Sequence, residues 1–559
     1  MFKQVLEKIK KIDFCYVLII LFTLIVSLMY ADKIMFPQSD VGRELYFPME
    51  VLNGKVLYKD IFNLFGPLSY LFTALIFKIF GASVSTFYCI GNVFAILMVT
   101  GVYMLSRKFM SKIFASAICL FIIIIGIVTQ TNFSYVTPYA SAMLYGAVAF
   151  VYSLYFYVRG IETDKIKYFY ISSFLAGIAV ANKYEFVFYA AFLAILFIWR
   201  YKENILKIIK LISLLVLPCL VGYLFLFAQG LTLRELINHF SSLLILMGTE
   251  GYHVLYKEAG SIANKITLIE GIKGLLTIIF VVSFAYLGMR VFNKQKLLGV
   301  IIIAVTYSVL IAKYAILIVT PSHALLSLPM VVSIVFIFLF NKTDEKEKFI
   351  CAAVLLVSFK VFFGMSLTVY GVYYAPFILI ALYILFKSEK LRTAFSLILL
   401  ILTFYMFKIS CERFDGSKMT PVGTKRNCIY TPKGRAYTIN SAISYIKTNS
   451  KPTDKVIVYP EGSLINALTG RPSDDYYYAL SPAYLEAWGE DNLIKYFSDK
   501  KNQPEYFIFA NEIMSSYGKD FICTDYGREF CRFVGENYTL DKIIVDPSEK
   551  TDVYVIYKR

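Results

Sequence analysis

The uncharged stretch Leu211–Ala228, LISLLVLPCLVGYLFLFA, decides the fold class of this chain. About 20 apolar residues in a helix cross the hydrocarbon core of a bilayer, and in lipid such a run satisfies its backbone hydrogen bonds only as a helix. Similar runs recur through roughly the first four hundred residues and then stop. They are Phe14–Tyr30, Val84–Leu105, Phe114–Thr129, Leu297–Val319 and Ala324–Phe340. The sequence therefore predicts a polytopic α-helical membrane protein.

The composition agrees with this class. Hydrophobic residues make up 58% of the 559 residues, charged residues make up 17%, and the mean hydropathy is +0.64. A soluble globular chain could not bury so much apolar surface. The first apolar run is long and lacks a small-residue cleavage site, so we expect a retained first helix rather than a cleaved signal peptide.

The net charge of +17 has a topological explanation. Basic residues gather in seven alternate connections between the apolar runs, whereas the connections around Asn132, Asn182 and Ser322 contain few of them. The positive-inside rule places the seven basic connections in the cytoplasm, and no single basic patch indicates nucleic-acid binding. They contain Lys3, Lys8, Lys10 and Lys11; Arg107, Lys108 and Lys112; Arg159, Lys165 and Lys167; Arg200, Lys202, Lys207 and Lys210; Arg290, Lys294 and Lys296; Lys342, Lys346 and Lys348; and Lys387, Lys390 and Arg392.

This alternation predicts about thirteen spanning helices in the plasma (inner) membrane, with the N-terminus in the cytoplasm. Residues 1–409 would form the membrane domain and residues 410–559 an extracytoplasmic α/β domain. Expected strands are 455–459, 505–510, 542–545 and 553–557, and expected helices are 438–448, 485–500 and 526–537. The cysteines of this region, Cys411, Cys428, Cys523 and Cys531, could form disulfides or stay free, and their spacing matches no metal motif.

Two long extracytoplasmic loops are expected, at residues 36–83 and 229–270. In the first, Val41–Leu52 has apolar residues at near-helical spacing, and Asn53-Gly54 and Gly66-Pro67 mark turns. This amphipathic loop is expected to lie on the membrane. The second loop mixes charged and apolar residues and could cover a site.

Acidic and basic residues crowd directly behind the first apolar run, in the segment SDVGRELY from Ser39 to Tyr46. Asp40 and Glu44 are four residues apart and would share one face of a helix, beside Arg43. A partly desolvated carboxylate held ionised by a guanidinium is suited to act as a general base. A solvated interfacial acid pair would show the same spacing, so the pattern alone leaves both interpretations open.

Further motifs follow in the same loop: Tyr46, then Gly54 with Tyr58 and Asp60, then GPLSY from Gly66 to Tyr70, then Phe80-Gly81. With Asp40, this order resembles the first extracytoplasmic loop of the GT-C superfamily of membrane glycosyltransferases. The similarity is to the bacterial branch related to protein O-mannosyltransferases and the lipid A aminoarabinose transferase. A membrane body of many helices with an outside C-terminal α/β domain is also typical of that family.

The resemblance implies transfer of a sugar from a polyprenyl-phosphate donor to an envelope lipid, glycan or protein, with Asp40 as the general base. A lipid phosphate leaves in that reaction, and cations near the outer surface must stabilise it. A structural interpretation also stays open for these cations: the lysines could extend their charged ends to the membrane interface, and the histidine could lie there, without binding a phosphate. The candidate substrate-binding residues are Arg43, Glu44, Tyr46, Tyr58, Asp60, Lys183, Lys313 and His323.

The chain departs from the family pattern in two places. Val41 stands where the aminoarabinose-transferase motif has a glutamate, and the loop around Pro138 lacks the second Asp of many relatives. Divalent-metal assistance is therefore unsupported, and we expect no cofactor and no metal site.

Two other functions fit parts of the pattern. One is a transporter or flippase of lipid-linked saccharides, and the other is a noncatalytic envelope-assembly protein. Glu461 and Arg471, in the segment Tyr459–Pro472, could hold an acceptor but better fit a structural turn. The aromatic residues Tyr476, Tyr477, Tyr478, Tyr484 and Trp488 could stack on sugar rings, although packing or membrane contact is the simpler interpretation.

Overall fold

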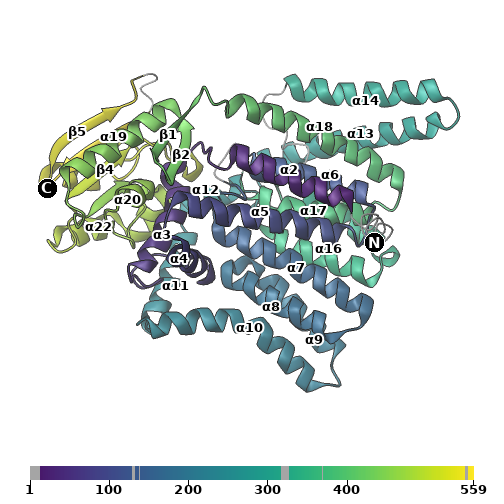
Figure 1. The fold of residues 1–559 in the computed structure, drawn as a ribbon, viewed down its shortest axis with the longest axis horizontal. Coiled ribbons are helices and arrows are strands. Elements are labelled where there is room, and N and C mark those ends of the chain that lie inside the picture. Colours follow the sequence, from purple (N-terminus) through teal and green to yellow (C-terminus); the bar gives the residue numbers. More distant parts are fainter. Residues whose placement is uncertain (1–12, 129–132, 138, 317–326, 368, 548–551) are drawn as a thin grey trace, which may run out of the picture.

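The computed structural model describes residues 13–128, 133–137, 139–316, 327–367, 369–547 and 552–559. A body of long helices, many of them side by side, carries a smaller α/β region at one end (Figure 1). The helices of the body are α2 (Phe14–Tyr30), α5 (Val84–Ser106), α6 (Lys112–Ile127), α7 (Ser141–Thr163), α8 (Ile166–Asn182), α9 (Val187–Arg200), α10 (Ile205–Ala228), α13 (Lys265–Phe292), α14 (Lys296–Ile316), α15 (Leu328–Leu339), α16 (Glu345–Val357), α17 (Gly371–Leu385) and α18 (Glu389–Arg413).

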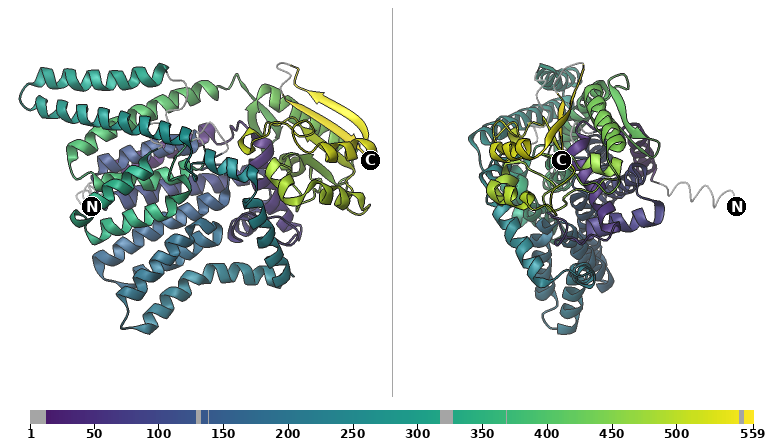
Figure 2. Two further views of the ribbon diagram at one scale, coloured as in Figure 1. Left: turned by 180° about the vertical axis from the view of Figure 1, so that it is seen from behind. Right: turned by 90° about the vertical axis from the view of Figure 1, so that its left-hand side faces the viewer.

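The described residues confirm a multi-pass membrane protein. Five helices are long and apolar enough to cross a bilayer, and seven shorter apolar helices accompany them. The predicted total of thirteen spans remains a prediction. Helices α13 and α14 form a hairpin along one flank of the body, and α10 runs along the opposite flank (Figures 1 and 2).

Ion pairs gather five of the basic connections at one end of the body. Lys108 and Lys346 approach Glu162 at 2.6 and 3.7 Å, and Arg200 lies 3.2 Å from both Asp164 and Glu345. A further pair joins Lys387 to Glu347 at 2.6 Å. Since alternate connections of a bundle emerge on the same side, this arrangement agrees with the topology expected from the charge pattern.

The C-terminal region has the mixed α/β character expected from its sequence. Its four-stranded sheet has the order β3-β4-β6-β5, with β3 and β4 parallel and the other pairs antiparallel. All four expected strands are present, and an additional hairpin, β1-β2, joins the sheet region to α18. The strands are β1 (Met419–Thr424), β2 (Asn427–Pro432), β3 (Val456–Tyr459), β4 (Tyr506–Ala510), β5 (Thr539–Val545) and β6 (Val553–Lys558).

The expected helices are also present, although one of them is divided. Residues 485–500 form two helices because Gly489 adopts a φ of 77°, which an L side chain rarely tolerates. The helices of this region are α19 (Lys433–Asn449), α20 (Ser463–Thr469), α21 (Pro482–Trp488), α22 (Glu490–Ser498) and α23 (Arg528–Asn537).

One disulfide, Cys523–Cys531, forms within the C-terminal region, whereas Cys411 and Cys428 are free. A structural disulfide is typical of an oxidising compartment. The sequence had left pairing open, and the structure therefore supplies an observation that favours the extracytoplasmic side.

The first long loop is helical, and its expected position on the membrane remains a prediction. It forms a short π-helix, η1 (Pro37–Val41), followed by α3 (Gly42–Leu52) and α4 (Leu68–Phe80). Nearly every residue of α3 is buried, because α20 of the C-terminal region packs against it. A Cβ on Gly42 would lie 2.4 Å from the backbone nitrogen of Leu464, so only glycine permits this approach.

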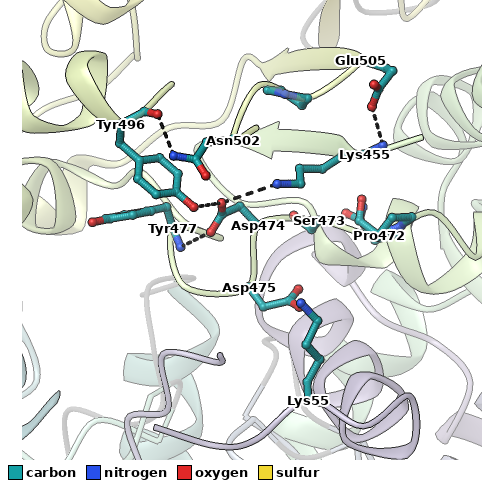
Figure 3. A network of polar contacts seen from close by, with 12 residues as sticks. Lys55, Lys455, Pro472, Ser473, Asp474, Asp475, Tyr477, Tyr496, Asn502 and Glu505 are labelled. Atoms are coloured by element: carbon teal, nitrogen blue, oxygen red, sulfur yellow. Dashed lines mark hydrogen bonds and ion pairs between the residues drawn. The ribbon is translucent and has the colours of Figure 1, made fainter. Parts of the chain in front are cut away.

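A network of polar contacts holds the C-terminal region together above this loop (Figure 3). Asp474 accepts hydrogen bonds from the backbone N–H of Tyr477 and the hydroxyl of Tyr496. Lys55, in the turn after α3, lies 3.9 Å from the buried carboxylate of Asp475. The loop and the C-terminal region are thus tied together by charge as well as by packing.

Candidate functional site

Asp40 and Arg43 lie where the first loop, the membrane body and the C-terminal region meet. Nη2 of Arg43 lies 3.3 Å from Oδ1 of Asp40, and its Nη1 donates to the hydroxyl of Tyr478 at 2.8 Å. The guanidinium also lies 4.9 Å from the ring centre of Tyr139. The Asp40 side chain is 25% exposed, whereas that of Arg43 is 4% exposed. A buried cation therefore holds a partly accessible carboxylate.

Asp40 and Glu44 have different surroundings, although they are four residues apart. Asp40 lies in the short π-helix η1, and Glu44 lies in the α-helix α3 that follows it. Glu44 is fully buried and accepts hydrogen bonds from the Tyr70 hydroxyl at 3.0 Å and the Ser141 backbone N–H at 3.0 Å. Burial raises the pKa of Glu44, although Arg43 opposes the shift. Glu44 thus joins the loop to α7.

Three other candidates from the loop also make structural contacts. The Tyr46 hydroxyl accepts from the backbone N–H of Ser473 at 2.9 Å, and Asp60 accepts from the backbone N–H of Val56 at 2.8 Å. The Tyr58 hydroxyl donates to the Phe65 carbonyl at 2.7 Å. These contacts fix the shape of the loop.

Lys183 belongs to a buried charged cluster that the sequence indicated only in part. It follows α8 directly and lies 3.6 Å from Glu185, which in turn lies 2.8 Å from Lys360. Tyr374 donates a hydrogen bond to the same carboxylate. Two lysines and one glutamate therefore give this cluster a net positive charge. Lys360 was missed, although an isolated lysine in the apolar segment Leu355–Phe363 is the same kind of signal as Lys313.

Burial and charge act against each other in this cluster. Burial lowers the pKa of Lys183 to about 8, since Glu185 only partly offsets the loss of solvent. For Glu185, burial opposes ionisation, but Lys360 and Lys183 outweigh it and lower the pKa to about 2. For Lys360, burial is outweighed by Glu185, which raises the pKa. The cluster is therefore ionised near neutral pH, with Lys183 the group most ready to lose its charge.

The lysines line a cavity of about 160 Å³. Its remaining walls are mainly apolar and aromatic and come from the first loop, from α11 (Leu233–Met247) and α12 (Glu250–Glu258), and from the C-terminal region. The second long loop thus lines a cavity, as its composition had suggested. The lining residues other than the charged cluster include Leu64, Phe65, Tyr139, Leu243, Met247, Tyr252, Leu255, Tyr256, Tyr370 and Tyr517.

The GPLSY motif places the first loop against this cavity. The backbone N–H of Gly66 donates to the Asn182 carbonyl at 2.9 Å, and a Cβ there would lie 2.1 Å from the Ala181 carbonyl oxygen. This close approach brings the ring of Phe65 to 4.2 Å from Nζ of Lys183. The glycine is thus required by packing between two parts of the site.

Glu461, for which the sequence favoured a role in a turn, lies within the electrostatic influence of Asp40. It is buried just before α20, and burial together with the charge of Asp40 raises its pKa to about 8. Arg471 does have a structural role, since it donates to the backbone carbonyls of Thr469 at 2.8 Å and Ser450 at 2.7 Å. The C-terminal region therefore contributes an acidic group close to Asp40.

The tyrosines and tryptophan of the C-terminal region pack against the first loop. The rings of Tyr478 and Phe47 lie 4.9 Å apart, and Phe62 lies 6.1 Å from Trp488. This supports the packing interpretation of the aromatic run. His323 lies outside the described residues, and Lys313 belongs to α14, but its side chain is outside the described part. Among the described residues, no group of three or more His, Cys, Asp or Glu side chains could hold a metal ion.

Residues 66–247 match the family described as dolichyl-phosphate-mannose-protein mannosyltransferase. This confirms the family resemblance inferred from the loop motifs. No curated protein sequence matches the chain significantly.

Two solved structures can be compared with the whole chain. The archaeal oligosaccharyltransferase AglB from Archaeoglobus fulgidus, in complex with an inhibitory peptide and a dolichol-phosphate, has 12% identity and a TM-score of 0.47, over 97% of this chain and 74% of AglB. ArnT from Cupriavidus metallidurans, bound to undecaprenyl phosphate, has 12% identity and a TM-score of 0.41, over 97% of both chains.

Proposed function

We propose that this chain, with residues 66–247 in the dolichyl-phosphate-mannose-protein mannosyltransferase family, transfers a sugar from a polyprenyl-phosphate donor to an envelope acceptor on the extracytoplasmic face. The observation that carries the proposal is the buried Lys183–Glu185–Lys360 cluster in a largely apolar cavity, whose wall residue Tyr139 lies 4.9 Å from the guanidinium of Arg43.

The lysine cavity suits the lipid-phosphate end of such a donor. A phosphate needs cations when it is removed from water. Glu185 offsets one of the two lysine charges, so the cluster keeps a net charge of +1. Apolar residues of α11 and α12, such as Leu243, Met247 and Leu255, suit the first isoprene units. The same cations would stabilise the charge that develops on the leaving phosphate.

Asp40 is the proposed general base. The acceptor hydroxyl oxygen attacks the anomeric carbon, its proton passes to the Asp40 carboxylate, and the bond from that carbon to the phosphate oxygen breaks. The electron pair of that bond leaves with the lipid phosphate. Arg43, 3.3 Å away, favours the ionised form of Asp40 that this step requires.

The test compares wild type with Asp40→Asn in lipid nanodiscs, using a radiolabelled polyprenyl-phosphate sugar and an envelope extract as acceptor. We expect sugar transfer to fall at least about 100-fold, which is the lower end of the effect of general base catalysis, while donor binding is retained. Asp491→Asn, an exposed change on α22, is the matched control.

Three outcomes would contradict the proposal. If folded Asp40→Asn transfers sugar as fast as wild type, Asp40 is not the base. If the wild type moves the donor across the bilayer without cleaving it, the chain is a transporter of lipid-linked saccharides, and if it does neither, it is a noncatalytic assembly protein.

A further inference from the structure

A second cavity, of about 550 Å³, lies between the first loop and the C-terminal region. Its walls come from the start of η1, from α19, and from the ends of β4 and β6. Cavities of about 300–1,000 Å³ are the usual size for small-molecule sites. The lining residues used below are Phe36, Gln38, Arg435, Glu512, Asp552 and Tyr554.

Among the described residues, three buried polar atoms around this cavity have no hydrogen-bond partner. They are Oε1 of Gln38, Nε of Arg435 and Oε2 of Glu512. Gln38 is 5% exposed, and a buried polar atom without a partner destabilises the fold. The three atoms come from three separate segments, and a polar ligand with both donors and acceptors would pair them. The other guanidinium nitrogens of Arg435 already donate to the Met35 carbonyl and the Asp552 carboxylate.

The cavity lies beside the proposed general base. Gln38 belongs to the same π-helix as Asp40, two residues before it. Burial and the charges of Glu461 and Asp40 raise the pKa of Glu512, to about 8. Among the described residues, none lines both this cavity and the lysine cavity. Asp40 influences both cavities: burial is the main cause that raises the pKa of Tyr517 in the lysine cavity, and the charge of Asp40 adds to it.

We propose that this second cavity is the acceptor site and that the acceptor is a saccharide; this rests on the proposed function. Sugar hydroxyls both donate and accept, so one ring can donate to Gln38 and Glu512 and accept from Arg435. An aliphatic lipid tail would leave all three atoms unpaired. The ring of Phe36 lies 4.4 Å from the Arg435 guanidinium at the cavity wall, where it holds the charged group in place.

The test measures binding without any donor, so it does not depend on catalysis. Full-length protein in nanodiscs is titrated with methyl glycosides of glucose, galactose, mannose and N-acetylglucosamine, and with a serine-containing tripeptide, by saturation-transfer NMR. Gln38→Ala and Glu512→Ala are compared with Glu536→Ala, an exposed change on α23. Thermal unfolding of each variant shows that it is folded.

We expect at least one glycoside to bind wild type and Glu536→Ala equally, and to bind each cavity variant at least tenfold more weakly. Binding by the tripeptide alone, by no glycoside, or by glycosides equally in all variants would overturn the inference. Asp40→Asn separates the two proposals: it should lose transfer and keep glycoside binding. Transfer that survives in Asp40→Asn contradicts the proposed mechanism. Equal glycoside binding by wild type, Gln38→Ala and Glu512→Ala contradicts only the acceptor site.

Discussion

Replacing Lys360 by methionine tests the lysine cavity by its charge. In the wild type, Lys183 and Lys360 face one carboxylate, Glu185, so the cluster carries a net charge of +1. Lys360→Met keeps an unbranched side chain only one atom shorter and reduces this net charge to zero. A unit charge about 4 Å from a phosphate is worth about 4 kcal/mol at an effective dielectric constant of about 20.

Residual water and Lys183 will compensate part of this loss. We therefore expect single-turnover sugar transfer from a polyprenyl-phosphate donor to fall about 100- to 1,000-fold, the range found when one group that stabilises a developing anion is removed. Binding of the free polyprenyl phosphate, measured by its effect on thermal unfolding, should weaken as well. Lys294→Met, an exposed change between α13 and α14, is the matched control and should leave both measurements unchanged.

A double variant makes the test specific for charge. Lys360→Met with Glu185→Gln restores a net charge of +1, carried by Lys183, and should recover at least about tenfold of the lost transfer. If folded Lys360→Met transfers within twofold of wild type, the phosphate does not bind at this cluster. If the double variant recovers nothing although it is folded, net charge is not the reason for the defect.

Three further predictions concern pH and packing. Because burial lowers the pKa of Lys183 to about 8, donor affinity should fall as pH rises through 8, and Lys183→Arg should show a flatter profile in the same binding assay. Burial and the charge of Asp40 raise the pKa of Glu461 to about 8, so between the ordinary glutamate pKa and pH 8 the unfolded state binds fewer protons than the folded state, and stability falls as the pH rises. At pH 8, Glu461→Gln should therefore be more stable than wild type in thermal unfolding, by at least about 1.4 kcal/mol, the equivalent of one pKa unit. At pH 4 the two should be equally stable, and an equal gain at both pH values would contradict this assignment. Gly66→Ala would place a Cβ 2.1 Å from the Ala181 carbonyl oxygen, so we expect lower thermal stability by about 1–3 kcal/mol and lost donor binding; an unchanged unfolding curve would refute the close packing.

Local sequence patterns predicted much of the architecture. The apolar runs predicted the helices, the strand-like segments predicted β3 to β6, and the motifs of the first loop indicated the family that residues 66–247 match. The spacing of Asp40 and Glu44 did not reveal that their surroundings differ. Asp40 is 25% exposed beside Arg43, whereas Glu44 is buried and bonded to Tyr70 and Ser141, and burial depends on segments that are distant in the sequence.

The local sequence was enough to predict the membrane class, the helical body with its C-terminal α/β region, and two residues of the candidate site, Asp40 and Lys183. Each follows from local properties, namely hydrophobic length, charge at helix ends and short motifs. Only the tertiary structure placed Lys360 beside Glu185, and Glu461 and Glu512 within the electrostatic influence of Asp40. The physical reason is that the pairing and desolvation of charges depend on which distant segments pack together, and spacing along the chain does not encode this.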